Sequence, residues 1–357
     1  MMMKNFLFII IIFFTALPVY AQSDEKSAFE QPLENIMENS DIEFESIKES
    51  PIKSIFEVVK QSVIEGVSKP LSVFYKISAV LILSSMINFF ATAQSKNVSQ
   101  FVNMVCVLVI FYNVFSNFDL IVKDVSGTLF NIKNFLITFL PVFAGISVAS
   151  GEIVTATIYT GFFLISIVWV SDFCVKYILP SINLFLAIGI TSAISSAINL
   201  KSLCEFYSKA VKIAMTAVVS ILCFALTLQT SITQGQDTLA IKTGKMFVTS
   251  AVPIIGNALQ SAVGSVYASM RVLKGFSGLV GILGILQIFL PTIVTLSVNW
   301  CGFYAVIILS EILENDTAVN VLSRFKDTIE ILLSMTVLFL VLLIFSLCIM
   351  INVTQGV

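Results

Sequence analysis

From Leu71 onward the chain is a succession of long apolar stretches, and this pattern limits its fold more than any other feature. A helix of ~20 apolar residues matches the ~30 Å hydrocarbon core of a bilayer. Charged residues make up only 12% of the chain and hydrophobic residues 57%, whereas a soluble domain carries about 25% charged residues. Backbone polar groups in lipid need internal partners, which helices provide. The sequence therefore predicts an all-α, polytopic integral membrane protein with about seven to eight transmembrane helices.

The span boundaries follow from the length of the apolar stretches. The stretch from Phe276 to Ser310 would make a helix of roughly 52 Å, which is too long for one span but leaves no loop for two. We therefore expect Pro291 to break it into a span and an interfacial helix. The predicted spans are 71–93, 98–118, 134–151, 153–171, 177–200, 213–231, 276–297 and 331–353. They form a membrane domain of about six spans over 71–231 and a C-terminal region of about two spans over 276–357.

The first 21 residues are typical of a signal peptide. A positive start with Lys4 precedes an apolar run from Phe6 to Phe14, and small residues lead to Ala21. An uncleaved first span is the alternative, but the apolar run is short for a crossing. We expect cleavage after Ala21, with the mature N-terminus outside the cytoplasm. Lysine and arginine counts do not decide the orientation, so it depends on the signal peptide.

Residues 22–70 form an acidic external arm. Residues 22–50 carry nine acidic side chains against two lysines and few apolar residues, which indicates a solvated tail or a segment that docks on a basic partner. Residues 51–69 instead predict an amphipathic helix on the membrane face or on a partner, ending near Gly66 to Pro70. Its apolar positions at helical spacing are Ile52, Ile55, Phe56, Val59, Val63 and Val67.

Composition excludes several kinds of chemistry. The chain has no histidine, which removes Ser-His-Asp and Cys-His catalysis and histidine metal sites. Its six cysteines form no Cys-x-x-Cys pair, no Gly-x-x-x-x-Gly-Lys-Ser/Thr phosphate loop is present, and no predicted span holds two aspartates. With 20 basic and 22 acidic residues, the chain lacks the charge of a nucleic-acid binder. We therefore expect no enzyme activity, no cofactor, no metal and no nucleic-acid partner.

The predicted membrane region contains a row of glycines and a stripe of polar side chains. Glycines recur every third residue at Gly275, Gly278, Gly281 and Gly284, which predicts either a close helix crossing or local flexibility. Polar side chains follow one helix face near the end of the 177–200 span. This stripe indicates hydrogen bonds to a neighbouring helix or a wet path, and its residues are Ser192, Ser195, Ser196 and Asn199.

Residues 232–275 differ from the spans on either side. Apolar residues alternate there at spacings of three and four, and small residues occupy the other face, which predicts an external or interfacial helix, a re-entrant element or a helix packed on copies of itself. The segment contains Asp237-Thr238-Leu239-Ala240-Ile241-Lys242-Thr243-Gly244-Lys245, followed by Val252-Pro253-Ile254-Ile255-Gly256.

This pattern resembles the stage III sporulation protein AE family of endospore-forming bacteria. The family is similar in having an Asp, a basic-Thr-x-Lys stretch and an apolar-Pro-apolar-apolar-Gly stretch, together with a signal peptide, an external arm and many spans. The family often has a more Gly-rich approach to the Asp than this chain. The residues that match the family motif are Asp237, Lys242, Thr243, Lys245, Pro253 and Gly256.

The resemblance implies a non-enzymatic subunit of a channel or secretion-like complex. Family members are multi-pass proteins of the mother-cell membrane around the forespore, where they join other stage III sporulation subunits, including a separate ATPase, to support late forespore development. Membrane lipids and copies of the chain itself are further candidate partners. A stand-alone permease for a small solute is the alternative function.

Physical roles for the motif are hypotheses. Asp237 would cap the helix that follows it, Pro253 would bend that helix, and Gly256 would admit a close neighbour. Lys242 and Lys245 would bind lipid phosphates or an acidic partner. A capped surface helix with solvated lysines is the alternative.

Overall fold

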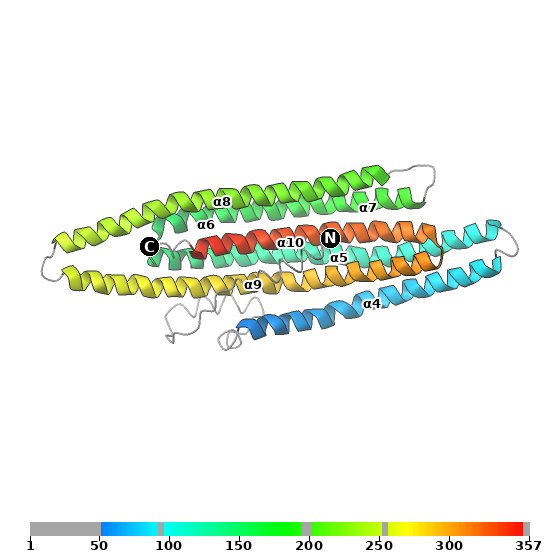
Figure 1. The fold of residues 1–357 in the computed structure, drawn as a ribbon, viewed down its shortest axis with the longest axis horizontal. Helices are drawn as coiled ribbons and strands as arrows, with labels where there is room; N and C mark the ends of the chain where they lie inside the picture. The colour runs from blue at the N-terminus through cyan, green and yellow to red at the C-terminus, as the bar shows by residue number, and fades with distance from the viewer. Residues whose placement is uncertain (1–50, 92–95, 195–200, 252–255, 353–357) are drawn as a thin grey trace.

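The computed structural model describes residues 51–91, 96–194, 201–251 and 256–352, and these residues form long helices without any strand. The helices run side by side along the long axis of an elongated bundle (Figure 1). The predicted signal peptide and the acidic arm up to residue 50 lie outside the described residues. The elements are α4 (Pro51–Ala91), α5 (Lys96–Ala149), α6 (Ile153–Phe173), a π-helical turn η1 (Cys174–Ile178), α7 (Leu179–Ile194), α8 (Lys201–Ala251), α9 (Gly256–Ile312) and α10 (Asp316–Asn352).

The bundle confirms the prediction of an all-α polytopic membrane protein. Within the described residues, six segments are long and apolar enough to cross a bilayer. The sequence predicted seven to eight spans, with separate spans at 98–118 and 134–151, whereas the structure has one continuous helix over this range. In the structure Lys123 and Asp119 form an ion pair of 2.7 Å on the continuous helix α5, because i and i+4 side chains are neighbours on one helix face. The six segments are Pro70–Phe90, Phe101–Ala149, Ile153–Thr191, Ser202–Gln229, Gly264–Ile312 and Asp316–Ile351.

Two predicted helix breaks at prolines are wrong. α4 continues through Pro70, and α9 continues through Pro291 to Ile312. A proline removes one backbone hydrogen bond, but a helix packed against neighbours keeps its course because the rest of its backbone bonds and its packing remain. α9 packs against α4, α5 and α10. This packing outweighs the tendency of Pro291 to break the helix.

The turns of the bundle are short. α5 and α6 are joined at 150–152, where Gly151 has a φ of 91°, a value that glycine adopts without strain. This turn agrees with the predicted boundary between the 134–151 and 153–171 spans. α9 and α10 are joined at 313–315, and the side chain of Asn315 accepts a hydrogen bond of 3.1 Å from the N–H of Ala318. Asn315 thus caps α10.

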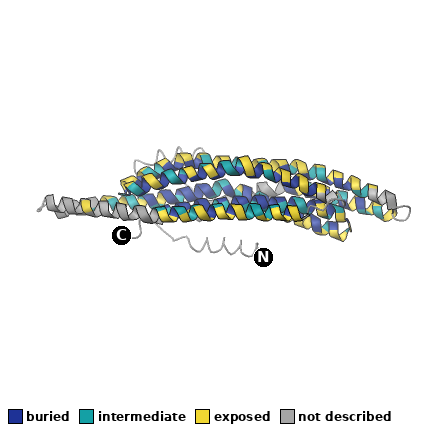
Figure 2. Ribbon diagram, turned by 90° about the horizontal axis from the view of Figure 1, so that it is seen from above, coloured by how far each residue is buried: buried dark blue, intermediate teal, exposed yellow. Residues whose placement is uncertain are grey.

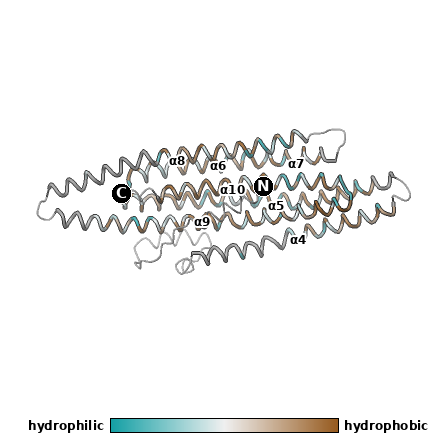
Figure 3. Tube along the Cα trace, viewed as in Figure 1, coloured by the Kyte–Doolittle hydropathy of each residue, from teal (hydrophilic) through white to brown (hydrophobic). Residues whose placement is uncertain are grey.

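Aromatic side chains fill the core between α9, α10 and α5. Phe289 of α9 meets Phe339 of α10 edge to face, with ring centroids 6.1 Å apart, and both are fully buried. Figure 2 shows buried positions facing inward and exposed positions facing outward along the described parts of the helices. Many outward positions are hydrophobic, and in Figure 3 the hydrophilic positions of α10 lie in its half nearer α7. Apolar side chains therefore form much of the outward-facing surface of the described helices.

Candidate functional site

The motif residues lie where α8 and α9 reach beyond the other helices at one end of the bundle (Figure 1). Asp237, Lys242, Thr243 and Lys245 belong to α8, and Gly256 begins α9. Thr243 is exposed, and Pro253 lies outside the described residues. The capping hypothesis for Asp237 is wrong, because α8 runs unbroken from Lys201 to Ala251 and leaves no free helix start at residue 237. The roles of the motif lysines stay predictions.

Three of the four predicted packing glycines lie against large side chains. A Cβ built on Gly278 would lie 2.3 Å from Ile351 of α10 and 3.3 Å from Phe143 of α5. A Cβ on Gly281 would lie 2.4 Å from the ring of Phe139 of α5.

The same arrangement continues at the next glycine. A Cβ on Gly284 would lie 2.5 Å from Phe135 of α5, whereas one on Gly275 would meet nothing within 4 Å. The three phenylalanines form a row along α5, with neighbouring ring centroids 5.5 and 5.7 Å apart. The structure therefore places Gly278, Gly281 and Gly284, but not Gly275, where the rings of α5 approach the backbone of α9.

The predicted polar stripe is only partly within the described residues. Ser192 belongs to α7, but its side chain is outside the description, as are Ser195, Ser196 and Asn199. Packing of this stripe on a helix and a wet path both stay predictions.

A buried ion pair joins the turn between α5 and α6 to α9. The Lys274 Nζ lies 2.5 Å from the Glu152 carboxylate, and the two side chains are only 1% and 6% exposed. Gly151 places Glu152 at the end of this tight turn. Neither residue belongs to a pattern that the sequence singles out. The available signal was a lone acid between two apolar stretches and a lone lysine before another.

A second group of charges lies farther along the bundle. Lys133 of α5 and Lys176 of η1 both pair with Asp172 of α6, at 2.9 and 3.2 Å. Lys212 of α8 pairs with Glu330 of α10 at 2.6 Å. We call these five residues, together with Arg324, Lys326 and Asp327 of α10, the ionic belt.

A layer of uncharged helix segments separates the buried ion pair from the ionic belt. Glu152 and Asp172 are 20 residues apart, which corresponds to ~30 Å of helix. Two hydrogen bonds nearer the Glu152 end connect α6 to its neighbours: Tyr159 donates at 2.7 Å to the Ser346 carbonyl of α10, and Gln229 of α8 donates to the Ile158 carbonyl at 3.1 Å. Five helix segments cross this layer without a charged residue, namely 134–149, 153–171, 213–236, 275–310 and 331–352. We call the layer formed by these five segments the charge-free slab, and its depth matches the hydrocarbon core of a bilayer. α4 lies beside α9 at the same level, because Phe74 contacts Phe303, and it carries the exposed Lys60 there.

Polar side chains also connect α5 and α9 in the interior. The hydroxyls of Thr128 and Thr292 lie 2.5 Å apart, and both residues are buried. Asn117 donates a hydrogen bond of 3.1 Å to the side-chain carbonyl of Asn299. These pairs were not predicted, because isolated Thr and Asn residues in apolar stretches give no signal of their partners. They fix how α5 lies along α9.

Comparison with known proteins identifies the family. Residues 33–354 match the family described as stage III sporulation protein AE. Comparisons with curated proteins and with solved structures gave no match. The family match covers nearly the whole chain, and the described helices are those of a membrane protein. This chain belongs to the stage III sporulation protein AE family and is a stage III sporulation membrane protein.

Proposed function

We propose that this chain is a non-enzymatic subunit of a channel or secretion-like complex that joins the mother cell to the forespore. It lies in the mother-cell membrane around the forespore, with its mature N-terminus outside the cytoplasm. It assembles there with other stage III sporulation subunits, including a separate ATPase, and it supports late forespore development. Family membership supplies the sporulation context for this proposal.

The observation that carries a role as a subunit is the extent of the exposed apolar surface. Phe101 and Tyr112 of α5 are 67% and 77% exposed. They lie 32 and 21 residues before Lys133, so they are ~48 and ~32 Å along the helix from the ionic belt, on the side away from the charge-free slab. Phe89 at the end of α4 is 78% exposed. Apolar surface therefore extends well beyond one bilayer thickness.

Exposed apolar surface outside a bilayer favours contact with other proteins. Removing apolar surface from water stabilises an assembly by about 25 cal/mol per Å², and large apolar patches mark interaction sites. A stand-alone permease would need only the surface that lies within one bilayer. The additional apolar surface on α4 and α5 is more consistent with a subunit that other chains cover.

The experiment compares two surfaces of the same chain. Phe101→Ser and Tyr112→Ser would alter the surface beyond the ionic belt, and Ile158→Ser would alter an exposed position inside the charge-free slab. We expect the first two variants to lose co-purification with other complex subunits and to reduce spore yield, while Ile158→Ser retains the partners. Normal sporulation of a strain that lacks the chain would contradict the biological role. Solute transport by the chain alone in liposomes would favour the permease.

A further inference from the structure

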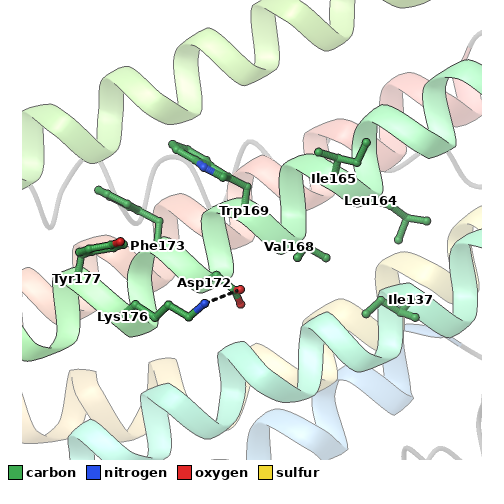
Figure 4. Close-up of a pocket in the computed structure, with 9 residues that line it drawn as sticks. All are labelled: Ile137, Leu164, Ile165, Val168, Trp169, Asp172, Phe173, Lys176 and Tyr177. Atoms are coloured by element: carbon green, nitrogen blue, oxygen red, sulfur yellow. Dashed lines mark hydrogen bonds and ion pairs between the residues drawn. The ribbon is translucent and has the colours of Figure 1, made fainter.

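An open groove of about 640 Å³ follows α6 at the level where the charge-free slab meets the ionic belt. Its apolar part is formed by Ile137 of α5 with Leu164, Ile165 and Val168 of α6. Figure 4 shows these side chains on the slab side of Asp172 and Lys176. The groove therefore has an apolar end within the slab and a charged end at its boundary.

The charged end carries an excess of positive charge. Asp172 is the carboxylate at this end, and it pairs with Lys176, drawn in Figure 4, and with Lys133 of α5. Two ammonium groups against one carboxylate leave one positive charge. The Lys176 side chain is 65% exposed, so its Nζ can form further hydrogen bonds with a ligand beside the helix. An ammonium group has three donors, and its bond to Asp172 uses one of them.

Three aromatic side chains of α6 and η1 lie beside the charged end of the groove. Trp169 stacks on Phe173, and Phe173 meets Tyr177 at a tilt, with ring centroids 5.5 and 5.6 Å apart, and all three line the groove (Figure 4). Trp169 and Tyr177 are both largely exposed. Exposed Trp and Tyr rings are enriched at the level of lipid headgroups because one edge is apolar and the other forms hydrogen bonds.

The helix changes from α to π geometry directly after α6, at Cys174–Ile178. The N–H of Leu179 bonds to the carbonyl of Cys174, which makes one turn of π-helix just before Pro180. Proline cannot supply the N–H that a regular α-helix needs, and a π-turn absorbs the mismatch. The turn contains Lys176 and Tyr177, so the same local feature sets the position of two side chains of the groove.

We propose that this groove binds one anionic phospholipid. The phosphate accepts hydrogen bonds from Lys176 and Lys133, and an acyl chain lies along Ile137, Leu164 and Val168. The location at the slab boundary, the apolar lining toward the slab and the excess positive charge together fit this occupant. A soluble anion would leave the apolar part uncovered, and a zwitterionic lipid would bring an added positive charge toward the two lysines.

Tryptophan fluorescence tests the proposal directly. The chain has two tryptophans, so Trp300→Phe leaves Trp169, which lines the groove, as the single reporter. The Trp300→Phe protein is placed in vesicles that contain equal fractions of phosphatidylglycerol and phosphatidylcholine, with bromine on the acyl chains of only one lipid at a time. We expect brominated phosphatidylglycerol to quench Trp169 more strongly, corresponding to an enrichment of about fivefold. Equal quenching by the two lipids would overturn the proposal.

Three further variants in this background identify the charges responsible. Lys133→Gln with Lys176→Gln should abolish the preference, and Asp172→Asn should increase it because it removes the carboxylate of the groove. Lys123→Gln is the matched control, since Lys123 is an exposed α5 lysine that pairs with Asp119 and does not line the groove. A preference that survives the double lysine variant, or that Lys123→Gln removes equally, would show general surface attraction and overturn the site. If the double variant does not fold, the direction of the Asp172→Asn effect decides.

Discussion

Glu152 and Lys274 are 122 residues apart in the chain, yet their side chains meet at 2.5 Å in a site that excludes solvent. The pair connects the turn between α5 and α6 to α9. Its level also marks one end of the charge-free slab. Because an isolated charge in a low-dielectric interior is costly, each residue restricts where the other can lie. The pair therefore fixes the position of α9 along the bundle.

Removing one member of this pair should destabilise the protein strongly. Glu152→Gln or Lys274→Met breaks the 2.5 Å ion pair while the other charge stays buried, at a cost of about 3–5 kcal/mol. Thermal unfolding of the purified protein in detergent measures the effect. Lys123→Gln breaks the exposed pair with Asp119 and should cost at most about 0.5 kcal/mol.

The double variant of the pair gives the decisive comparison. Glu152→Gln combined with Lys274→Met removes both charges, so it should be more stable than either single variant. Additive losses in the double variant would show that the two side chains act independently, contrary to the structure.

The glycines of α9 provide a matched pair of substitutions. Gly281→Ala would place a methyl group 2.4 Å from the Phe139 ring, so the ring or the helix must shift. We expect a loss of about 1–3 kcal/mol, as is typical for overpacking a core. Gly275→Ala meets nothing within 4 Å and should be neutral or slightly stabilising, because alanine favours the helix. Unfolding in detergent should separate the two variants, and equal effects would contradict the close approach of α5 and α9.

Depth measurements can locate the charge-free slab. Nitroxide labels would replace Ile158, Ile165 and Leu184, which are exposed residues of α6 and α7. Ile158 and Ile165 lie within the slab, whereas Leu184 is 12 residues beyond Asp172, or ~18 Å. In nanodiscs the first two labels should be more accessible to oxygen, and the third to a water-soluble nickel reagent. Preferential access of oxygen to the Leu184 label would place the hydrocarbon core elsewhere on the bundle.

The all-helical membrane fold could be predicted because apolar stretches of span length have few other solutions. The turn at 150–152 could also be predicted, since Gly151 separates two such stretches. The breaks expected at Pro70 and Pro291 do not occur. Local sequence shows the lost hydrogen bond at a proline, but it does not show the neighbouring helices that hold α4 and α9 straight through it.

The buried ion pair of the site could not be predicted from the sequence, because it joins residues that lie far apart in the chain. Glu152 and Lys274 are visible as lone charges, but their pairing requires the topology of the whole bundle. The row of glycines predicted the close approach of another helix correctly at three of its four positions. Positions three residues apart rotate steadily around a helix of 3.6 residues per turn, so Gly275 and Gly284 point to opposite sides. A single spacing rule therefore cannot give all four glycines the same neighbour, and the structure shows open space at Gly275.

The hydroxyl pair of Thr128 and Thr292 should contribute a coupling energy between α5 and α9. Thr128→Val or Thr292→Val removes one hydroxyl and leaves the other without its 2.5 Å partner. Each single variant should cost about 1 kcal/mol, and the double variant should cost less than the sum, with a coupling of about 0.6 and at most about 1.7 kcal/mol. Thr138→Val is the control, because Thr138 and Thr128 each donate to the carbonyl four residues earlier, but Thr138 faces outward. A coupling of zero in the unfolding cycle would mean that each hydroxyl is satisfied within its own helix.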